Sequence, residues 1–388
     1  MCCCRTATCP RPSPAPRSTA GATPSTAPWA SSRTQRRRRG DRPDGHAHRP
    51  VPSGCAGDGP AAAVAGLTVA LLAVAALGLL VGARPLAPGF VLDVLTGAVD
   101  RTSPDALVVT EVRLPRTVLA VLAGAALGVA GVLAQGMTRN PIAEPGILGL
   151  NTGAALAVVL GIALLGVDTL SGYVWFGFAG AAVAAVVVAG VAGIGRRGSV
   201  SPATLALAGA ALAAGLQSIT ILFLLTDPQA FDDYRFWQVG SVAGRDLGIA
   251  AQAAPFVVAG LALALTCGPR LNALALGDDV ARSFGRPVGT DRAVCGVALV
   301  VLAGAATAAA GPIAFLGLAV PHLVRRLAGT DHRVVLPLAA LAGPVLLLAA
   351  DVLGRVVAPP GEVQAGVVTA VVGAPLFVAL VRRRRFLR

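Results

Sequence analysis

The chain has 388 residues and contains no lysine, because all 32 of its basic residues are arginines. A Walker A loop needs a lysine to reach the phosphates of a nucleotide, and Schiff-base catalysis needs a lysine amine. The sequence therefore excludes both kinds of site. If the work of this protein consumes ATP, a different chain must hydrolyse the nucleotide.

Motifs of other enzymes and of metal sites are equally scarce. The sequence has no H-E-x-x-H or G-x-S-x-G motif and no paired carboxylates at helical spacing in its apolar runs. Its seven cysteines form no C-x-x-C pair, and five of them fall within the first 60 residues. A metal site that joins these cysteines to His46 and His48 is a weak alternative. We therefore expect no catalytic residue, no bound metal and no cofactor.

Charged residues are also few, at 13% of the chain, whereas hydrophobic residues reach 55%. The charged share is about half of that in a typical soluble domain. Several apolar runs approach or exceed the roughly 18 residues of a membrane helix, and their apolar faces never alternate with charged ones, which argues against a soluble helical protein. The first run is too long for a secretory signal peptide. We therefore predict an all-α, polytopic protein of the cell (inner or plasma) membrane. Its ten predicted transmembrane helices are residues 61–83, 114–134, 147–166, 173–194, 202–225, 247–268, 291–310, 312–327, 334–353 and 362–381.

The first 60 residues differ in composition from the rest of the chain. They are rich in proline, serine and threonine, and they hold ten arginines against three aspartates. Such a segment buries too little apolar surface to fold, so we predict a disordered cytoplasmic tail over residues 1–60 and a membrane domain over residues 61–388. The RRRR run at 36–39 would suit nucleic acid or anionic lipid. A plain extension, or a start codon assigned too early, is the favoured interpretation, so no nucleic-acid partner is expected.

The distribution of arginine predicts the orientation of the helices. Cytoplasmic loops of membrane proteins are enriched in basic residues. With both termini in the cytoplasm, the outer segments hold most of the acidic residues together with seven arginines, which are Arg84, Arg101, Arg113, Arg116, Arg235, Arg245 and Arg355. The cytoplasmic loops then hold Arg139, Arg196, Arg197, Arg270, Arg282, Arg286, Arg292, Arg325, Arg326 and Arg333, and the basic run 382–385 ends the chain on the same side.

A break is expected within the apolar stretch from Ala293 to Val324. As a single helix this stretch would measure about 48 Å, against a hydrocarbon core of about 30 Å. Gly311 followed by Pro312 is the natural place for the break, because glycine permits a tight reversal and proline removes a backbone donor. Irregular backbone of this kind is stable only against protein or water, so we predict a large bundle of helices.

Close packing of these helices is predicted by two pairs of glycines four residues apart. Gly124 and Gly128 form one pair, and Gly149 and Gly153 form the other. Such pairs let membrane helices approach closely. We therefore assign them a packing role and no functional site.

Ionisable groups inside membrane helices mark ion or proton pathways, and the predicted helices contain almost none. Asp351 is expected at the outer end of a helix, where it meets water or pairs with Arg355. His322 is expected to be a structural residue rather than a proton relay. These features argue against an ion-driven transporter. Uncharged polar residues remain as a lining for a conduit, with side-chain packing as an equal alternative, and these are Gln217, Ser218 and Thr220.

One predicted cytoplasmic loop, residues 270–287, is longer than its neighbours and more apolar than a surface loop usually is. Asp278 or Asp279 is expected to cap a short helix in this loop, and Gly285 is expected to end it. An apolar projection of this kind favours a docking element for a soluble partner over a plain surface loop.

Five segments of the chain are informative as a set, through their order and spacing. They are VRLPRTVLAVLAGAALGVAGVLAQGMTRNPIAEPGILGLNTGA, LNALALGDDVARSFG, GPIAFLGLAVPHLVRRLAGTDHRVVLPLAALAG, LLLAADVLGR and GVVTAVVGAPLF. With them, residues from about 61 to 383 resemble the membrane permease subunits of ATP-driven (ABC-type) importers for iron–siderophores, haem and vitamin B12. The membrane domain would then be a transmembrane permease domain that is not itself an enzyme.

The resemblance implies partners on both sides of the membrane. Two ABC-type ATPase subunits would dock at the cytoplasmic face and an extracytoplasmic solute-binding protein at the outer face, around a homodimer or a pair with a homologous permease. Acidic residues of the binding protein would pair with Arg113, Arg116 and Arg355, and a cytoplasmic gate would lie at Ser199, Val200 and Ser201. Coupling to the ATPase would fall on Leu271, Asn272, Leu274, Leu276, Gly277, Asp278, Asp279, Ala281, Arg282 and Gly285.

The cargo follows from the resemblance only in outline. The segment WQVGSVAG, residues 237–244, is closer to siderophore permeases than to the vitamin B12 permease through Gly240 and Ser241. The resemblance thus implies import of an iron–siderophore complex by alternating access, with vitamin B12 or haem import as the alternative. An ion-coupled secondary transporter is a further alternative, which would need a carboxylate or a broken-helix ion site near the midplane. A purely structural or signalling subunit would not be needed for uptake.

Overall fold

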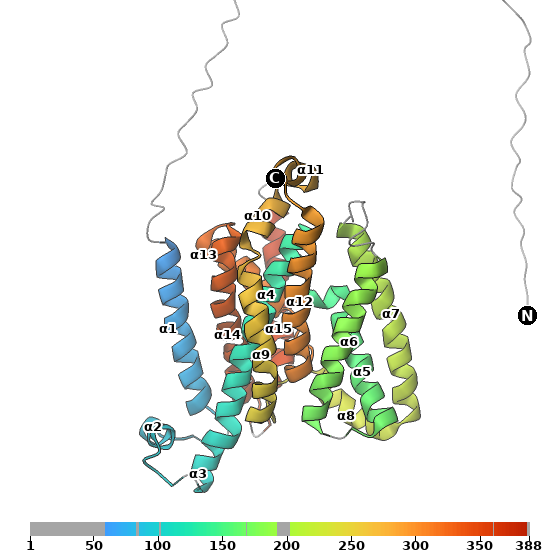
Figure 1. Ribbon diagram of the computed structural model, residues 1–388. Helices are drawn as coiled ribbons and strands as arrows, with labels where there is room; N and C mark the ends of the chain where they lie inside the picture. The colour runs from blue at the N-terminus through green and yellow to red at the C-terminus, as the bar shows by residue number, and fades with distance from the viewer. Residues whose placement is uncertain are drawn as a thin grey trace, which may run out of the picture. The chain divides into compact units, whose positions relative to one another are not determined.

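Figure 1 shows the computed structural model of the chain, which describes residues 59–82, 85–100, 102–167, 169–191, 202–359 and 361–385. All regular structure in these ranges is helical. The predicted tail lies almost wholly outside them, so its boundary with the membrane domain stays a prediction. Each of the ten predicted ranges coincides with a helix. These helices are α1 (Gly59–Leu80), α4 (Leu114–Thr138), α5 (Leu150–Leu165), α6 (Leu170–Val191), α7 (Pro202–Thr226), α9 (Leu247–Leu265), α12 (Val288–Ala310), α13 (Leu316–Ala328), α14 (His332–Val357) and α15 (Ala365–Arg385).

Short helical segments join the longer helices. All of them except the turn η1 begin or end at glycine, proline or a capping side chain, as α8 does where the Asp227 carboxylate accepts from the backbone N–H of Gln229 and Ala230. In the described residues they are α2 (Pro88–Thr96), α3 (Pro104–Leu107), the π-helical turn η1 (Val108–Arg113), the 3-10 turn η2 (Pro145–Leu148), α8 (Pro228–Gln238), α10 (Gly268–Ala275) and α11 (Asp278–Ser283).

Seven helical stretches of the described residues are long and apolar enough to cross a membrane, by length and composition. They are α1, α6, α7, α9, α12, α14 and the continuous stretch from α3 to α4, Pro104–Thr138. The apolar helix α5 has 16 residues and α13 has 13, and α15 begins with the short apolar stretch Ala365–Pro375. The fold is therefore that of a polytopic helical membrane protein, whereas the count of ten crossings and the side of each terminus stay predictions.

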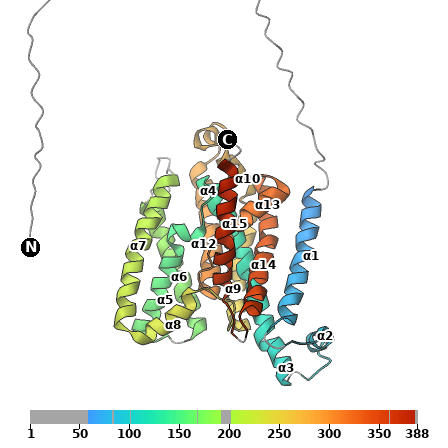
Figure 2. The same ribbon diagram turned by 180° about the vertical axis from the view of Figure 1, so that it is seen from behind.

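Helix α4 is the centre of the bundle. Figures 1 and 2 show it among α9, α12, α13 and α14. Of the most apolar 18 residues in the stretch Pro104–Thr138, 83% are buried, against 6% of the corresponding residues in α1. The glycines of α4 make this possible, because a Cβ atom on Gly124 would lie 2.6 Å from the Pro344 Cα, and one on Gly128 would lie 2.7 Å from the Ala339 carbonyl oxygen. The predicted packing role of these two glycines is confirmed.

The second predicted pair of glycines divides. Gly153 packs α5 against α6, because a Cβ atom there would clash with Ala184 and the backbone of Gly180. Gly149 lies just before α5 and faces α7, but a Cβ atom there would be at the ordinary distance of 3.5 Å from the Gly209 carbonyl oxygen, so close packing does not require a glycine. It adopts φ 76° between η2 and α5, where the chain turns through a left-handed residue that glycine adopts without strain. The turn η2 occupies the residues that the sequence pattern placed in the helix.

The expected break after residue 310 is confirmed. Helix α12 ends at Ala310, Gly311 has φ 76°, and α13 begins at Leu316. Phe315, the residue before α13, is held in a left-handed conformation at φ 66°. Its N–H donates to the Glu144 carboxylate at 2.7 Å, which fastens the break to the loop after α4. Burial raises the pKa of the Glu144 carboxyl, and this hydrogen bond opposes the rise.

The two ends of the bundle carry different short segments (Figures 1 and 2). Helices α10 and α11 lie together at one end, which we name the α11 end. Helices α2, α3 and α8 lie at the opposite end, named the α8 end. The candidate functional residues divide between these two ends.

Candidate functional site

At the α8 end, three arginines gather around two carboxylates. We call Arg113, Arg116, Arg355, Asp351 and Glu362 the arginine cluster. Arg116 donates from Nε to Asp351 Oδ1 at 2.8 Å and from Nη1 to Glu362 Oε2 at 2.5 Å. Arg355, one turn after Asp351 on α14, donates to the same carboxylate. Asp351 thus pairs with two guanidinium groups from different helices.

Two of these arginines also close the end of α1. Arg113 donates from Nη1 to the carbonyl oxygens of Leu79 and Leu80, at 2.7 and 2.8 Å, and Arg355 donates to that of Gly78 at 2.7 Å. The last carbonyls of a helix lack intrahelical donors and carry partial negative charge, so a cation there is stabilising. The arginine cluster therefore ties α1 to α4 and α14.

The sequence placed the three arginines at one face, and the structure brings them to one end of the bundle. It also buries them, with exposed fractions of 3% for Arg113 and 4% each for Arg116 and Arg355. Asp351, fully buried, is the cause, because it draws two of them inward. Glu362 is the one acid of the cluster that reaches the surface, with a side chain 37% exposed. A docking role for the three arginines stays a prediction.

The sequence predicted part of the role of Asp351 and none of the role of Glu362. The pairing of Asp351 with Arg355 was expected from their spacing of four residues, whereas its pairing with Arg116 was not. Glu362 was missed altogether, since it lies 246 residues from Arg116 along the chain and follows no local pattern.

The predicted coupling loop forms α10 and α11 at the α11 end. Leu271, Leu274 and Ala281 are buried and anchor the two short helices on the bundle. Outward, Leu276 is 60% exposed and Phe284 is 73% exposed. The segment therefore carries an apolar surface on a fixed base, which is what the docking interpretation requires.

Ion pairs and hydrogen bonds hold α10 and α11 to the bundle. Asp278 pairs with Arg292 of α12 at 2.9 Å and with Arg139, after α4, at 3.4 Å. Asn272 donates to the Asp331 carboxylate at 2.6 Å, and this bond together with the Arg333 N–H lowers the pKa of Asp331. The segment is thus linked to α4, α12 and α14, so a displacement of α10 or α11 acts on three long helices.

The start of α11 differs from the prediction. Its N-cap is Gly277, with φ 100°, and neither Asp278 nor Asp279 caps it. Both aspartates lie in the first helical turn, where their charge favours the positive end of the helix dipole. The expected end is confirmed, because Gly285 adopts φ 74° directly after the C-cap residue Phe284.

The predicted path residues lie on α7. Thr220 is buried and donates to the Leu216 carbonyl, and the exposed Ser218 donates to the Ala214 carbonyl, so both hydroxyls bond within their own helix. Gln217 is half-buried. The predicted gate, Ser199, Val200 and Ser201, falls outside the described residues.

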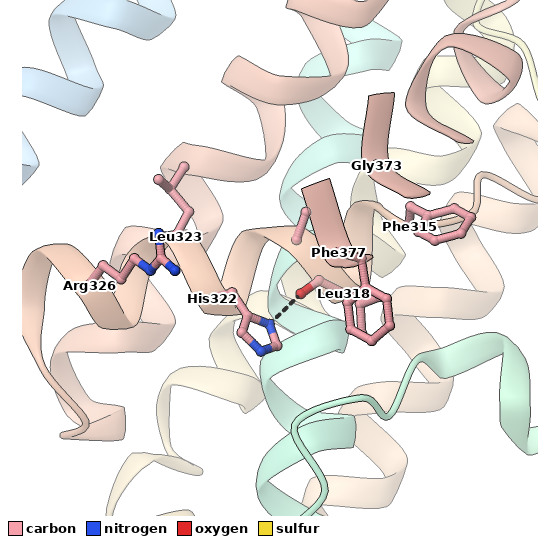
Figure 3. A pocket seen from close by; sticks show the side chains of 8 residues that line it. Phe315, Leu318, His322, Leu323, Arg326, Gly373 and Phe377 are labelled. Atoms are coloured by element: carbon pink, nitrogen blue, oxygen red, sulfur yellow. Dashed lines mark hydrogen bonds between the residues drawn. The ribbon is translucent and has the colours of Figure 1, made fainter. Parts of the chain in front are cut away.

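His322 lies in a small cavity between α13 and α15, of about 100 Å³, lined mainly by apolar side chains. Figure 3 shows its ring turned toward the Leu318 carbonyl oxygen, which lies 2.8 Å from Nδ1, with Phe315 and Phe377 nearby. This contact within one helix turn fits the structural role expected from the sequence. The described residues contain no group of three or more His, Cys, Asp or Glu side chains that would hold a metal ion.

An all-helical bundle with seven apolar stretches and an anchored, partly apolar projection at one end defines a multi-pass protein of the cell membrane. The chain belongs to the FecCD transport family, which it matches over residues 70–383.

Individual relatives are similar over most of their length. The ferric enterobactin transport system permease protein FepD of Escherichia coli is 45% identical over 325 residues, which cover 84% of this chain and 96% of that protein. The probable siderophore transport system permease protein YfiZ of Bacillus subtilis is 40% identical, over 71% of this chain and 83% of that protein. A metal-chelate type ABC transporter solved in an inward-facing conformation matches with a TM-score of 0.73 and 27% identity, over 84% of this chain and 99% of that one.

Proposed function

We propose that this chain is the membrane-spanning permease subunit of an ABC importer and that it moves a ferric chelate of the siderophore type into the cell. The observation that carries the proposal is the 45% identity to the ferric enterobactin permease over 96% of that protein. Likeness over nearly the whole length, rather than over one motif, supports a shared task as well as a shared fold.

The energy for transport would come from two separate ATPase subunits. The chain has no lysine for a Walker A loop, so it lacks the residue that holds the nucleotide phosphates. The exposed Leu276 and Phe284, on helices anchored to α4, α12 and α14, provide a surface for those subunits. In this proposal the α11 end is cytoplasmic, both termini lie on that side, and the chain crosses the membrane ten times.

The extracytoplasmic binding protein would dock at the α8 end. The arginine cluster holds three guanidinium groups against two carboxylates, so one positive charge remains in excess there. An excess of one sign of charge attracts and orients a partner with acidic groups, even where each ion pair contributes little. The partly exposed Glu362 is the point at which an incoming carboxylate would meet Arg116.

A second permease copy would complete the path. In helix α7 only 11% of the most apolar 18 residues are buried, and the half-buried Gln217 and the exposed Ser218 interrupt its mostly apolar surface. An amide against lipid tails is costly, so this face of α7 is better suited to a partner or a water-filled path. ATP binding and hydrolysis in the ATPase subunits at the α11 end would tilt α10 and α11, and this movement would open the path alternately to each side of the membrane.

The test is uptake of an iron-labelled chelate. A bacterial strain without its own ferric-siderophore permeases would receive this chain with its ATPase and binding-protein partners. We expect accumulation of a ferric siderophore that stops when the ATPase is inactivated, and no accumulation of labelled cobalamin or haem. Uptake by the purified chain in liposomes under an ion gradient, without any ATPase, would refute the proposal.

Import of vitamin B12 or haem is the alternative that this experiment separates from siderophore import. An ion-coupled transporter is disfavoured, because the carboxylate of Asp351 lies at the α8 end and is already paired with two arginines.

A further inference from the structure

Hydrogen-bond donors without acceptors concentrate in one segment at the α8 end. Among the described residues, the buried polar atoms that lack a hydrogen-bond partner include Tyr234 Oη, Trp237 Nε1 and Arg245 Nε, all within twelve consecutive residues. The side chains of Tyr234 and Trp237 belong to α8, and Arg245 lies in the loop from α8 to α9. Buried donors are almost always paired in folded proteins, so three orphans in one segment need an explanation.

Arg245 is the most unusual of the three. It is 7% exposed, although its neighbours Gly244 and Asp246 are exposed, so its side chain turns inward from a surface loop. The electrostatic influence of Tyr173 raises the pKa of Arg245, but no carboxylate of the described residues compensates the charge of Arg245. The Asp246 carboxylate is engaged elsewhere, because it accepts from the Ile249 N–H at the start of α9. Burial lowers the pKa of Arg245 to about 10.

Other buried arginines of this protein show the contrast. Arg116 and Arg355 share the carboxylate of Asp351, and Arg113 binds the carbonyls that end α1. A buried cation without an opposite charge is among the costliest arrangements in a protein and is a recognised mark of a functional site. The arginines of the cluster thus bind carboxylates or the carbonyls that end a helix, whereas Arg245 has no carboxylate beside it.

The backbone around Arg245 is held firmly. Ser241 donates from its N–H to the Ala310 carbonyl at 2.8 Å, and Gly240 accepts from the Gly366 N–H at 3.0 Å. These bonds tie the loop to the end of α12 and the start of α15. Left-handed glycines at 240 and 244, with φ 72° and 67°, set its course. The orphan donors therefore belong to a shaped segment.

From these unpaired donors we propose that three buried side chains receive the acidic oxygen atoms of the cargo chelate, with Arg245 supplying the positive charge and Tyr234 and Trp237 supplying neutral donors. The inference rests on the proposed import of a ferric chelate and adds that the chelate is anionic. A ferric centre in an oxygen-rich, negatively charged chelate presents the acceptors that this segment lacks. Because the three donors are buried in this structure, the proposal requires a second conformation of the transport cycle in which the cargo reaches them. Hydrogen bonds gained from the cargo would then favour that second conformation.

The test compares Arg245→Gln and Arg245→Lys in the complete transporter, with uptake of three labelled chelates: an anionic ferric tricatecholate, ferric citrate and an uncharged ferric trihydroxamate. We expect wild type to take up an anionic chelate, R245Q to reduce that uptake at least tenfold, and R245K to keep it within about threefold. The matched control is Arg235→Gln, which removes a charge from the same end at a side chain that is 54% exposed. Uptake by R235Q should stay within about twofold of wild type.

Thermal unfolding of each purified subunit separates binding from structure. Because R245Q removes an uncompensated buried charge, its unfolding temperature should equal or exceed that of wild type. A lower unfolding temperature, unchanged uptake by R245Q, or wild-type uptake of the uncharged chelate alone would overturn the inference. Absence of uptake of every ferric chelate by wild type would instead overturn the proposed function.

Discussion

At the scale of single residues, Asp351 has the largest structural task in the arginine cluster. Its carboxylate is fully buried and pairs with both Arg116 and Arg355, which come from α4 and α14. Removing one partner of a buried ion pair leaves the other charge uncompensated, and this usually costs more than the pair contributes. Asp351 leaves two such charges behind, so it is the most sensitive position of the cluster.

We therefore predict that Asp351→Asn lowers the free energy of unfolding by about 3–5 kcal/mol. Thermal unfolding of the purified subunit in detergent measures the change. Asp279→Asn is the matched control, since the Asp279 side chain is 99% exposed and pairs only with Arg282 on the surface. The control should unfold like wild type, and equal stability of both variants would contradict a structural task for Asp351.

Residue roles were predicted from the sequence where spacing along one helix reveals them. Asp351 and Arg355, four residues apart, were expected as a pair. Arg116 contacts Glu362 because the start of α4 lies beside the segment that precedes α15. No pattern in the sequence encodes this long-range contact. The burial of the arginines follows from the same long-range contact, so it too lay beyond the sequence.

At the scale of elements, the apolar runs predicted the ten longer helices, because helix length and the break at Gly311 depend on local chemistry. The short helices α2, α3 and α8 were not predicted, since their apolar residues are too few to form a run. Gly149 shows the same limit, because a turn and a helix can share one glycine spacing.

Helix α11 provides the prediction at this scale. Phe284→Ala removes an aromatic side chain that is 73% exposed, so the fold should be unaffected. If Phe284 anchors the ATPase, the variant should bind the ATPase subunit about tenfold or more weakly, as expected for a central aromatic contact. Co-purification and titration with the ATPase subunit measure this. Leu225→Ala is the control, because Leu225 is 80% exposed and lies one residue before the last residue of α7, far along the chain from the ATPase surface and at the opposite, α8 end of the bundle. Equal binding by both variants would place the ATPase elsewhere.

At the scale of the whole molecule, the subunit is an incomplete transporter in the proposed function. It holds no nucleotide site, its path would be shared with a second copy, and its cargo would be delivered by a binding protein. The apolar exposure of α1 and α7 is compatible with lipid contact, whereas the half-buried Gln217 singles out α7 as the side for another protein chain.

We accordingly predict that the purified chain forms dimers in lipid nanodiscs and that Ile221→Trp disrupts them. Ile221 is 46% exposed and lies four residues after Gln217 on the same face of α7, and an added aromatic ring would not fit a packed interface. Val69→Trp on α1, where Val69 is 66% exposed, should keep the dimer, because lipid adapts to the larger side chain. Single-particle mass measurement in nanodiscs distinguishes the two forms. A monomer in wild type, or equal effects of both changes, would remove α7 from the interface.

The clasp of Arg355 on the end of α1 joins residues 277 positions apart in the chain. Ribosomal synthesis delivers Arg113 soon after α1, so the carbonyls of Leu79 and Leu80 gain their donor early, whereas the Gly78 carbonyl waits for Arg355 until translation is nearly complete. The bond that fastens α1 to α14 is therefore among the last of the bundle to form, and a polypeptide that stops before α14 lacks it.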